Sequence, residues 1–479
     1  MMRSNRCSRP VAVLAFAGLL VVSSAGAATA APDDGEASFR ALYKELVEIN
    51  TTLSSGSCTE AAQAMAARLQ AAGMAKDSMQ VLAPPDRPKS GALVAIMPGS
   101  DRRLEPIMLL AHIDVVEAKR EDWERDPFTL VEEDGYFYAR GASDDKAMAA
   151  VITDIMVRFQ GEGFKPRRAV KLALTCGEET PSTFNSVDWL IKTRPGVLKA
   201  KFVLNEGAGG LLAADGKHLA LDVQAGEKVY QDFALETTNP GGHSARPVRD
   251  NAINRLAAGL TRLAGYQFPI TWNQTTRAYF EAQAGMASPE VARDIRSVLA
   301  NPQDAAAADR LWITDPGWNG MMRTTCVATQ IEGGHAPNAL PQRARANVNC
   351  RILPGVPIET VQEDLRRVVA DDGIGISPSG NRGLVAPVPP LTQQIMDPVK
   401  TVAAGLWPGV PIIPTLSAGA TDGRFLNAAG IPTYGLSGMF ADAAGSRAHG
   451  LNERIRVQSL LDGRRFLYEV VRLYAQQAD

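Results

Sequence analysis

The chain has 479 residues, of which 45% are hydrophobic and 21% are charged, and its formal net charge is −2. A single hydrophobic core stops growing beyond about 250–300 residues, so this length predicts at least two domains. The balanced charge excludes the basic footprint of a nucleic-acid-binding protein, and the composition is that of a globular chain rather than a disordered one.

The N-terminus has the three parts of a secretory signal peptide. Three arginines within the first nine residues precede an apolar run over 11–22, and small residues follow up to Ala30. The apolar run is shorter than the about 20 residues that span a bilayer. We therefore expect residues 1–30 to be removed, leaving a periplasmic or secreted protein without stable membrane association.

Helical and strand patterns alternate through the first part of the mature chain. Helices are predicted over 38–49, 59–72, 147–159 and 187–193, and strands over 91–98, 107–111, 169–175 and 201–204. The same pattern returns after the proline-rich segment 385–390, with helices over 392–406 and 457–474 and strands over 410–416 and 431–436. This alternation predicts an α/β domain with a mostly parallel sheet.

The pattern between these two α/β portions is different. Strands are predicted over 229–237, 323–332, 343–353 and 373–377, and helices over 251–263 and 358–370. The order β-α-β-β-α-β is that of a ferredoxin-like unit. We therefore predict an α+β domain over 225–380, inserted into an α/β domain formed by 31–224 and 381–479. Residues 271–322 carry helical patches to which the sequence assigns no role.

Four cysteines remain after removal of the signal peptide: Cys58, Cys176, Cys326 and Cys350. An exported protein folds where disulfides form. A Cys326–Cys350 disulfide is expected if their strands are neighbours, and buried free thiols are an equal alternative in a chain of this size.

Acidic residues or a histidine follow four β-runs of the α/β portion. They are His112 and Asp114, Asp144 and Asp145, Glu178 and Glu179, and Glu206. Ligands of open α/β sheets bind beyond the carboxyl ends of the strands, so these side chains are expected to converge, together with the late His449. Singly, each has a plain explanation; an Asp-Asp pair, for example, often caps a helix.

Carboxylates gathered in one place repel one another unless cations neutralise them. Two divalent ions that share a carboxylate are a known solution. Nitrogen and oxygen ligands without thiolates suit Zn²⁺, with Co²⁺ or Mn²⁺ as alternatives.

Together these motifs resemble the M20 metallopeptidase family of dinuclear zinc hydrolases, which includes carboxypeptidases, aminoacylases, dipeptidases and deacetylases. The matching motifs are His112-x-Asp114, Arg140-Gly-x-x-Asp144-Asp-Lys146, Gly177-Glu-Glu179, Asn205-Glu-Gly207 and His449. The resemblance runs from about Ser38 to the C-terminus. Ala147 stands where the family usually has glycine, and this departure removes no ligand.

The resemblance implies a role for each of these side chains. The metal ligands would be the bridging Asp144, with His112 and Glu206 on one ion and Glu179 and His449 on the other. Asp114 would orient His112, and Glu178 would be the general acid/base. The peptide bond between Asp144 and Asp145 is expected to be cis, as is common in the family.

The resemblance also makes the inserted domain a lid that forms a homodimer. His243, in a Gly-Gly-His-Ser motif, would polarise the scissile carbonyl, often from the partner subunit. Arg351 and Asn338 resemble the family's grip on a substrate carboxylate, for which an arginine fork is well shaped. The loop that carries Thr421, Asp422 and Arg424 matches one that lines the substrate cleft.

The resulting prediction is an exported zinc hydrolase that cleaves the amide bond of a small peptide or N-acyl amino acid next to a free carboxylate. Glu206 favours the deacylase and carboxypeptidase members, because aminopeptidases and many dipeptidases of the family carry aspartate there. A dipeptidase that acts on free-amino dipeptides is the first alternative. A non-catalytic binding protein on the same scaffold is the second, and the complete ligand set argues against it.

Overall fold

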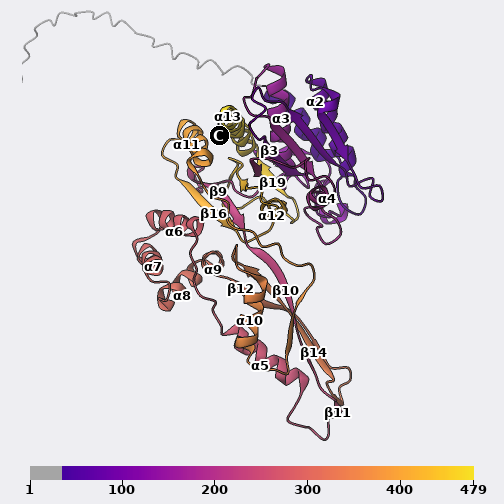
Figure 1. The fold of residues 1–479 in the computed structure, drawn as a ribbon, viewed down its shortest axis with the longest axis vertical. Coiled ribbons are helices and arrows are strands. Elements are labelled where there is room, and N and C mark those ends of the chain that lie inside the picture. Colours follow the sequence, from indigo (N-terminus) through magenta and orange to yellow (C-terminus); the bar gives the residue numbers. More distant parts are fainter. Residues whose placement is uncertain (1–34, 479) are drawn as a thin grey trace, which may run out of the picture.

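Two sheets organise the residues described by this computed structural model, which are 35–478; the predicted signal peptide lies outside them. The chain passes directly from the first sheet to the second, because β9 (His218–Glu227) is separated from β10 (Val229–Thr238) by one residue. It returns through residues 380–392. Figure 1 shows the second sheet extending away from the first as an elongated arm. Within the described part of the chain, none of the helices combines the length and apolar character that a bilayer crossing requires.

The first sheet has ten strands, and its centre is parallel. Its order is β1-β2-β6-β3-β7-β17-β9-β8-β18, with β16 paired to β9. The further strands are β1 (Met79–Leu82), β2 (Ala92–Met97), β3 (Ile107–His112), β6 (Val170–Thr175), β7 (Phe202–Asn205), β8 (Gly210–Leu212), β16 (Ile412–Ser417), β17 (Thr433–Gly435) and β18 (Phe440–Ala441). The pairs β6–β3, β3–β7 and β7–β17 are parallel, which confirms the predicted α/β class.

Helices pack on this sheet through their apolar faces. They are α1 (Glu36–Glu48), α2 (Cys58–Ala71), α3 (Lys146–Gly161), α4 (Ser186–Thr193), α11 (Gln393–Leu406), α12 (Gly423–Ala428) and α13 (Val457–Gln476). Every residue of β3 and β6 is buried, as expected for parallel strands covered on both faces. A separate small sheet joins β4 (Val131–Glu133), β5 (Tyr136–Tyr138) and β19 (Arg454–Arg456).

The second sheet is antiparallel and has the order β12-β14-β10-β15. It is formed by β10, β12 (Thr325–Gly333), β14 (Arg343–Ile352) and β15 (Gly375–Ser379), with helices α5 (Ala252–Ala264) and α10 (Ile358–Val369). These helices and the sheet share a core that includes Phe233, Leu256, Val348 and Leu365. The chain order is the predicted β-α-β-β-α-β. A short ribbon of β11 (Gly242–His243) and β13 (Ala339–Leu340) forms the far tip in Figure 1.

The segment without a predicted role folds into four helices: α6 (Gln274–Met286), α7 (Pro289–Ala300), α8 (Ala305–Thr314) and α9 (Pro316–Met322). They enclose a small core that includes Phe280, Ile295 and Leu311. Leu416 of β16 and Leu353 after β14 belong to the same core. The four helices therefore pack against both sheets, near the point where the chain crosses between them.

Two disulfides link the four cysteines that the predicted mature chain contains. Cys326 and Cys350 are register partners on β12 and β14 and are bonded, so the free-thiol alternative is wrong for this pair. Cys58 and Cys176 form a second disulfide across 118 residues, which joins the start of α2 to the turn after β6. Sequence analysis did not predict this second bond.

Candidate active site

The turns after three neighbouring strands provide most of the candidate site. Strands β6, β3 and β7 are adjacent and parallel, so they end at the same edge of the sheet. His112 is the last residue of β3, Glu178 and Glu179 follow β6, and Glu206 follows β7 directly. The convergence expected from the strand-end rule is therefore present.

Two groups of ligand atoms share the carboxylate of Asp144. His112 Nε2 lies 3.0 Å from Asp144 Oδ1 and 3.6 Å from Glu206 Oε2. His449 Nε2 lies 3.2 Å from Asp144 Oδ2 and 3.0 Å from Glu179 Oε2. Within each group the ligand atoms lie within 4.8 Å of one another. These nitrogen and oxygen donors fit two divalent cations that share one carboxylate.

The peptide bond between Asp144 and Asp145 is cis, as expected from the resemblance. Asp144 ends a turn whose backbone N–H groups point at the fully buried carboxylate of Glu453. Glu453 accepts hydrogen bonds from the N–H groups of Gly141 at 3.0 Å, Ser143 at 2.8 Å and Asp144 itself at 2.9 Å. One side chain therefore sets the backbone from which the shared carboxylate projects.

Glu453 also connects this turn to the loop that carries His449. Arg140 Nη1 donates to Glu453 Oε2 at 2.6 Å, and Arg140 Nη2 donates to the carbonyl of Gly450 at 2.9 Å. Both side chains are almost fully buried, with 3% and 1% of their surface exposed. Sequence analysis missed this pair, because its members are 313 residues apart and neither local sequence indicates that the two loops meet.

Asp114 holds the first histidine and the glutamate turn together. His112 Nδ1 lies 3.0 Å from the carbonyl oxygen of Asp114 and 3.7 Å from its carboxylate. The Asp114 carboxylate accepts hydrogen bonds from the N–H groups of Glu178 at 3.3 Å and Glu179 at 3.1 Å. Asp114 thus orients the His112 ring mainly through its backbone, and its side chain fixes the turn that presents both glutamates.

Burial and close charges perturb the protonation of the site. Burial raises the pKa of Glu178 to about 9 and the pKa of Glu179 to about 7. A hydrogen bond to Asp144 raises the pKa of His449 to about 9. Burial acts to raise the pKa of Asp144, yet hydrogen bonds from the two histidines hold it below its usual range. Without bound cations, protonation of Glu178 and His449 therefore reduces the negative charge of the gathered carboxylates. Bound cations would reduce that charge in the same way.

Two of the three residues predicted to line the substrate cleft are internal. Asp422 is fully buried, and its oxygens accept hydrogen bonds from Thr175 Oγ1 and Asn185 Nδ2, both at 2.6 Å. Thr421 is also buried and hydrogen-bonds to Glu227 through its hydroxyl and its N–H. This corrects the prediction that Thr421 and Asp422 contact the substrate, because their polar atoms hydrogen-bond within the protein. Asp422 holds the end of β6 through Thr175, and Thr421 holds the carboxylate of Glu227.

The predicted carboxylate-binding residues lie at opposite ends of the second sheet. Arg351 lies near the first sheet, where its Nη1 donates to the carbonyl of Ala418 at 3.1 Å. Asn338 and His243 are exposed side by side at the tip, where the N–H of Ser244 donates to the carbonyl of Asn338. Strand β14 runs between the two ends, and eight residues of strand span about 26 Å. One chain therefore does not bring Arg351 and Asn338 to the same carboxylate.

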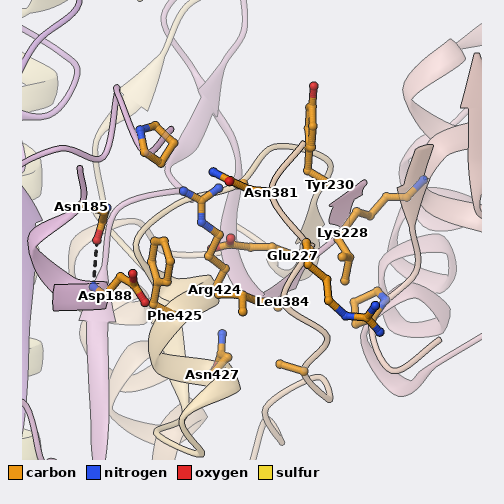
Figure 2. A pocket seen from close by; sticks show the side chains of 18 of the residues that line it. Asn185, Asp188, Glu227, Lys228, Tyr230, Asn381, Leu384, Arg424, Phe425 and Asn427 are labelled. Atoms are coloured by element: carbon orange, nitrogen blue, oxygen red, sulfur yellow. Dashed lines mark hydrogen bonds between the residues drawn. The ribbon is translucent and has the colours of Figure 1, made fainter. Parts of the chain in front are cut away.

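Three cavities lie in the region of the strand ends of the described chain, and the linings of the two larger ones have no residue in common. The larger, of about 660 Å³, lies where the two sheets meet, between α4, α12, the start of β10 and residues 380–387. Figure 2 shows Phe425 and Asp188 on one wall of this cavity, Tyr230 on the other, and Arg424 between them. The smaller of these two, of about 280 Å³, is lined by Asp144 and Glu206 of the site itself. The third, of about 70 Å³, is lined by Asp114, Cys176 and Gly177, among others.

Comparison with known proteins identifies the family to which these features belong. The model of "Peptidase family M20/M25/M40" matches residues 108–473. This chain belongs to that family. It is 30% identical over 392 residues to the human N-fatty-acyl-amino acid synthase/hydrolase PM20D1, covering 78% of this chain and 75% of the relative. It is 24% identical over 373 residues to mouse aminoacylase-1, covering 77% and 80%.

Solved structures of the family have the same fold. The M20 family metallo-carboxypeptidase Sso-CP2 from Sulfolobus solfataricus has a TM-score of 0.66 at 20% identity, covering 91% of this chain and 99% of that one. The dipeptidase Dug1p from Saccharomyces cerevisiae has a TM-score of 0.62 at 16% identity, covering 93% and 98%. The chain is thus an M20 hydrolase of the carboxypeptidase, aminoacylase and dipeptidase type, as the motifs predicted.

Proposed function

We propose that this M20 hydrolase is an exported two-metal amidohydrolase that cleaves N-acyl amino acids or small peptides next to a free carboxylate. The observation that carries the proposal is the position of Asp144, whose two oxygens face His112 and His449 at 3.0 Å and 3.2 Å. A carboxylate between two such ligand groups is suited to bridging two cations.

His112, Asp144 and Glu206 would hold one cation, and Asp144, Glu179 and His449 the other. Zn²⁺ fits these donors best, with Co²⁺ or Mn²⁺ as alternatives. When bound, such cations supply Lewis acidity that lowers the pKa of a water molecule and polarises a carbonyl oxygen.

Glu178 is the general acid/base of this proposal. Glu178 belongs to neither of the two ligand groups. Its backbone N–H donates a hydrogen bond to Asp114, which fixes it next to Glu179. Its pKa of about 9 in the protein alone falls when positive charge enters the site, which brings it toward the range of an effective base. Glu178 would take the proton of the attacking water and deliver it to the leaving amine nitrogen.

The substrate's free carboxylate would be bound by Arg351 of the same chain. Arg343 and Arg351 are separated by about 26 Å of β14, and His243 and Asn338 lie at the tip beyond Arg343, so they would serve the site of a second copy. There His243 would donate a hydrogen bond to the oxyanion, and Asn338 would contact the substrate.

A homodimer through the second sheet supplies this arrangement. Strand β12 is an edge strand whose residues 327–333 are all exposed, including the apolar Val327 and Ile331. An open edge of this kind readily pairs with another chain. Export is supported by the predicted signal peptide and by the two disulfides, which form in oxidising compartments.

A dipeptidase acting on free-amino dipeptides is the second candidate, and the fold likeness to Dug1p favours it. The names of the human and mouse relatives and the glutamate at position 206 favour N-acyl substrates instead. Metal analysis and hydrolysis of N-acetyl-alanyl-alanine, N-acetyl-alanine and free alanyl-alanine decide between them. Two metals and preferred cleavage of the acetylated substrates are expected; preferred cleavage of the free dipeptide selects the alternative, and a metal-free inactive protein refutes both.

A further inference from the structure

We propose that the Cys58–Cys176 disulfide positions the glutamate turn (residues 176–179) for catalysis, and that full activity requires this bond in its oxidised form. The inference rests on the proposed function, in which Glu178 is the general acid/base and Glu179 is a metal ligand. Cys176 directly follows β6, and only Gly177 separates it from Glu178. The bond therefore acts on the chain at the point where both glutamates are presented.

Cys58 gives this turn a rigid attachment point. It is the first residue of α2, and the preceding Ser57 caps that helix by accepting a hydrogen bond from the N–H of Glu60 at 3.2 Å. The helix packs in the core of the first sheet through fully buried residues that include Ala62 and Met65. A helix packed at core density shifts little, so a covalent bond to its first residue restrains the chain at the other end.

The segment before Cys58 is also bound to the chain that follows β3. The N–H of Val115 donates to the carbonyl of Thr51 at 3.4 Å. The N–H and the hydroxyl of Ser54 donate to the carboxylate of Glu117 at 2.9 Å and 2.8 Å. Cys58 is therefore linked by hydrogen bonds to the segment after β3 and by a covalent bond to the end of β6.

Asp114 lies between the disulfide and the glutamate turn. One of its carboxylate oxygens lies within 4.8 Å of the sulfur atoms of Cys58 and Cys176, and all three residues are buried. The same carboxylate accepts the N–H groups of Glu178 and Glu179 at 3.3 Å and 3.1 Å, which is long for bonds of this kind. Long hydrogen bonds restrain weakly, so the turn depends on the packing that keeps this carboxylate in place.

Reduction of the bond would act on Glu178 through Asp114. Two thiols need more room than a disulfide, because their sulfur atoms are then in van der Waals contact and each carries a hydrogen. The Asp114 carboxylate is packed beside both sulfurs, so it shifts, and the N–H groups that it holds shift with it. Gly177, at a φ of 92°, has no side chain to resist this movement. A displacement of about 1 Å at a catalytic group can cost about 100-fold in rate.

The alternative is a bond that only stabilises the fold. The N–H and the carbonyl of Cys176 both hydrogen-bond to Ser186 at 2.8 Å, and Asn185 Nδ2 donates to the carbonyl of Gly177 at 3.2 Å. If these contacts suffice to place the turn, loss of the disulfide lowers the free energy of unfolding and leaves the folded enzyme equally active. The kcat of the folded enzyme therefore separates the two roles.

The first test compares two double variants that each keep one disulfide. With saturating metal and N-acetyl-alanine as substrate, Cys58→Ser/Cys176→Ser is expected to lower kcat by at least about tenfold. KM should change little, because the substrate carboxylate is bound by Arg351 on the second sheet. Cys326→Ser/Cys350→Ser is the control and should keep its kcat; any effect there falls on KM, since Cys350 directly precedes Arg351. Circular dichroism establishes that each variant is folded at the assay temperature.

Reduction of the folded enzyme is a second measurement, and it decides the matter if Cys58→Ser/Cys176→Ser does not fold. A water-soluble phosphine attacks one sulfur and breaks the S–S bond; water gives its oxygen to phosphorus and its two hydrogens to the sulfurs, so phosphorus is oxidised and sulfur is reduced. The Cys326→Ser/Cys350→Ser variant, which retains the Cys58–Cys176 bond, should lose at least about tenfold in kcat with an unchanged circular dichroism spectrum. Oxidised glutathione, itself reduced to two thiols, should restore the bond and the activity. The phosphine should leave the remaining activity of Cys58→Ser/Cys176→Ser unchanged, which controls for effects on the metals.

The possible failures are distinguishable. An unchanged kcat after reduction, or equal losses of kcat in the two double variants, overturns the positioning role and leaves the proposed function intact. A loss of kcat that accompanies loss of the folded spectrum also overturns it, because the bond is then only stabilising. An untreated wild type that hydrolyses none of the N-acyl amino acids and peptides overturns the proposed function itself.

Discussion

The buried pair of Glu453 and Arg140 allows a sharp test of how the metal centre is held. In Glu453→Gln, an amide NH₂ replaces one of two oxygens that accept four hydrogen bonds, three of them from backbone N–H groups. The variant also leaves the buried Arg140 guanidinium without its counter-charge. The turn that presents Asp144 and the loop that presents His449 both lose their shared support.

The magnitude follows from burial. Removing one partner of a buried ion pair costs about 3–5 kcal/mol, since the remaining charge stays buried without compensation. Native domains are stable by only about 5–15 kcal/mol, so the free energy of unfolding is expected to fall by a large fraction. Mutation of a residue that hydrogen-bonds to a metal ligand and fixes its position typically changes metal affinity by about 10–100-fold. We expect Glu453→Gln to weaken metal binding within that range.

The chain contains a matched control. Arg68 Nε and Glu45 Oε2 are also 2.6 Å apart, but their side chains are 37% and 39% exposed. Because water already solvates both groups, Glu45→Gln is expected to cost no more than about 1 kcal/mol. Urea unfolding and competition with a chelator measure the two effects. Equal stability losses in Glu453→Gln and Glu45→Gln, with unchanged metal affinity, would refute this account of Glu453.

Three further predictions concern the glutamate base, the disulfides and the dimer. Folding raises the pKa of Glu178 from near 4.5 to about 9, so this group favours the folded state at low pH and loses that effect as pH rises. Metal-free enzyme should therefore be less stable in urea at pH 9 than at pH 5, and Glu178→Gln should reduce the difference while abolishing turnover of the metal-loaded enzyme. Replacing Cys58 and Cys176 by serine should lower the free energy of unfolding by about 2–5 kcal/mol. The same change at Cys326 and Cys350 should cost less, because that disulfide closes a loop of 24 residues rather than 118. Equal losses of stability in the two variants would contradict this loop-length argument. Equal amounts of inactive Glu178→Gln and His243→Ala subunits, unfolded and refolded together, should regain about a quarter of wild-type activity. In the proposed homodimer, half of the refolded dimers are mixed, and each mixed dimer has one intact site. No recovery of activity would place His243 in the site of its own chain.

The ligand groups could be anticipated because a local rule governs them. His112, Glu179 and Glu206 each lie at or after the end of a buried strand, and parallel strands end at one edge. The rule does not require knowledge of which strands are neighbours, only that they share a sheet. The motif resemblance then added Asp144 and His449, which lie on loops that no periodicity places.

Contacts between distant segments could not be anticipated in the same way. The Glu453–Arg140 pair and the Cys58–Cys176 bond depend on which loops meet after folding, and nothing in either local sequence records the partner. The loop with Asp422 and Arg424 shows a related limit. These residues are two apart, yet one is fully buried and the other lines a cavity, because they lie at the start of α12, where residues two apart point in different directions.

The length of the second sheet underlies the proposal that a second copy of the chain contributes to the active site. Strands β10 and β14 are ten residues each and pair along their whole length, so the sheet behaves as a stiff arm. Arg351 lies at the base of this arm, where its Nη1 donates to the carbonyl of Ala418. His243 lies at the tip, beyond the about 26 Å of β14 that separate Arg343 from Arg351. A rotation of the arm as a unit would leave this separation unchanged, and in the proposed homodimer the exposed edge of β12 is the surface on which a second copy would provide His243.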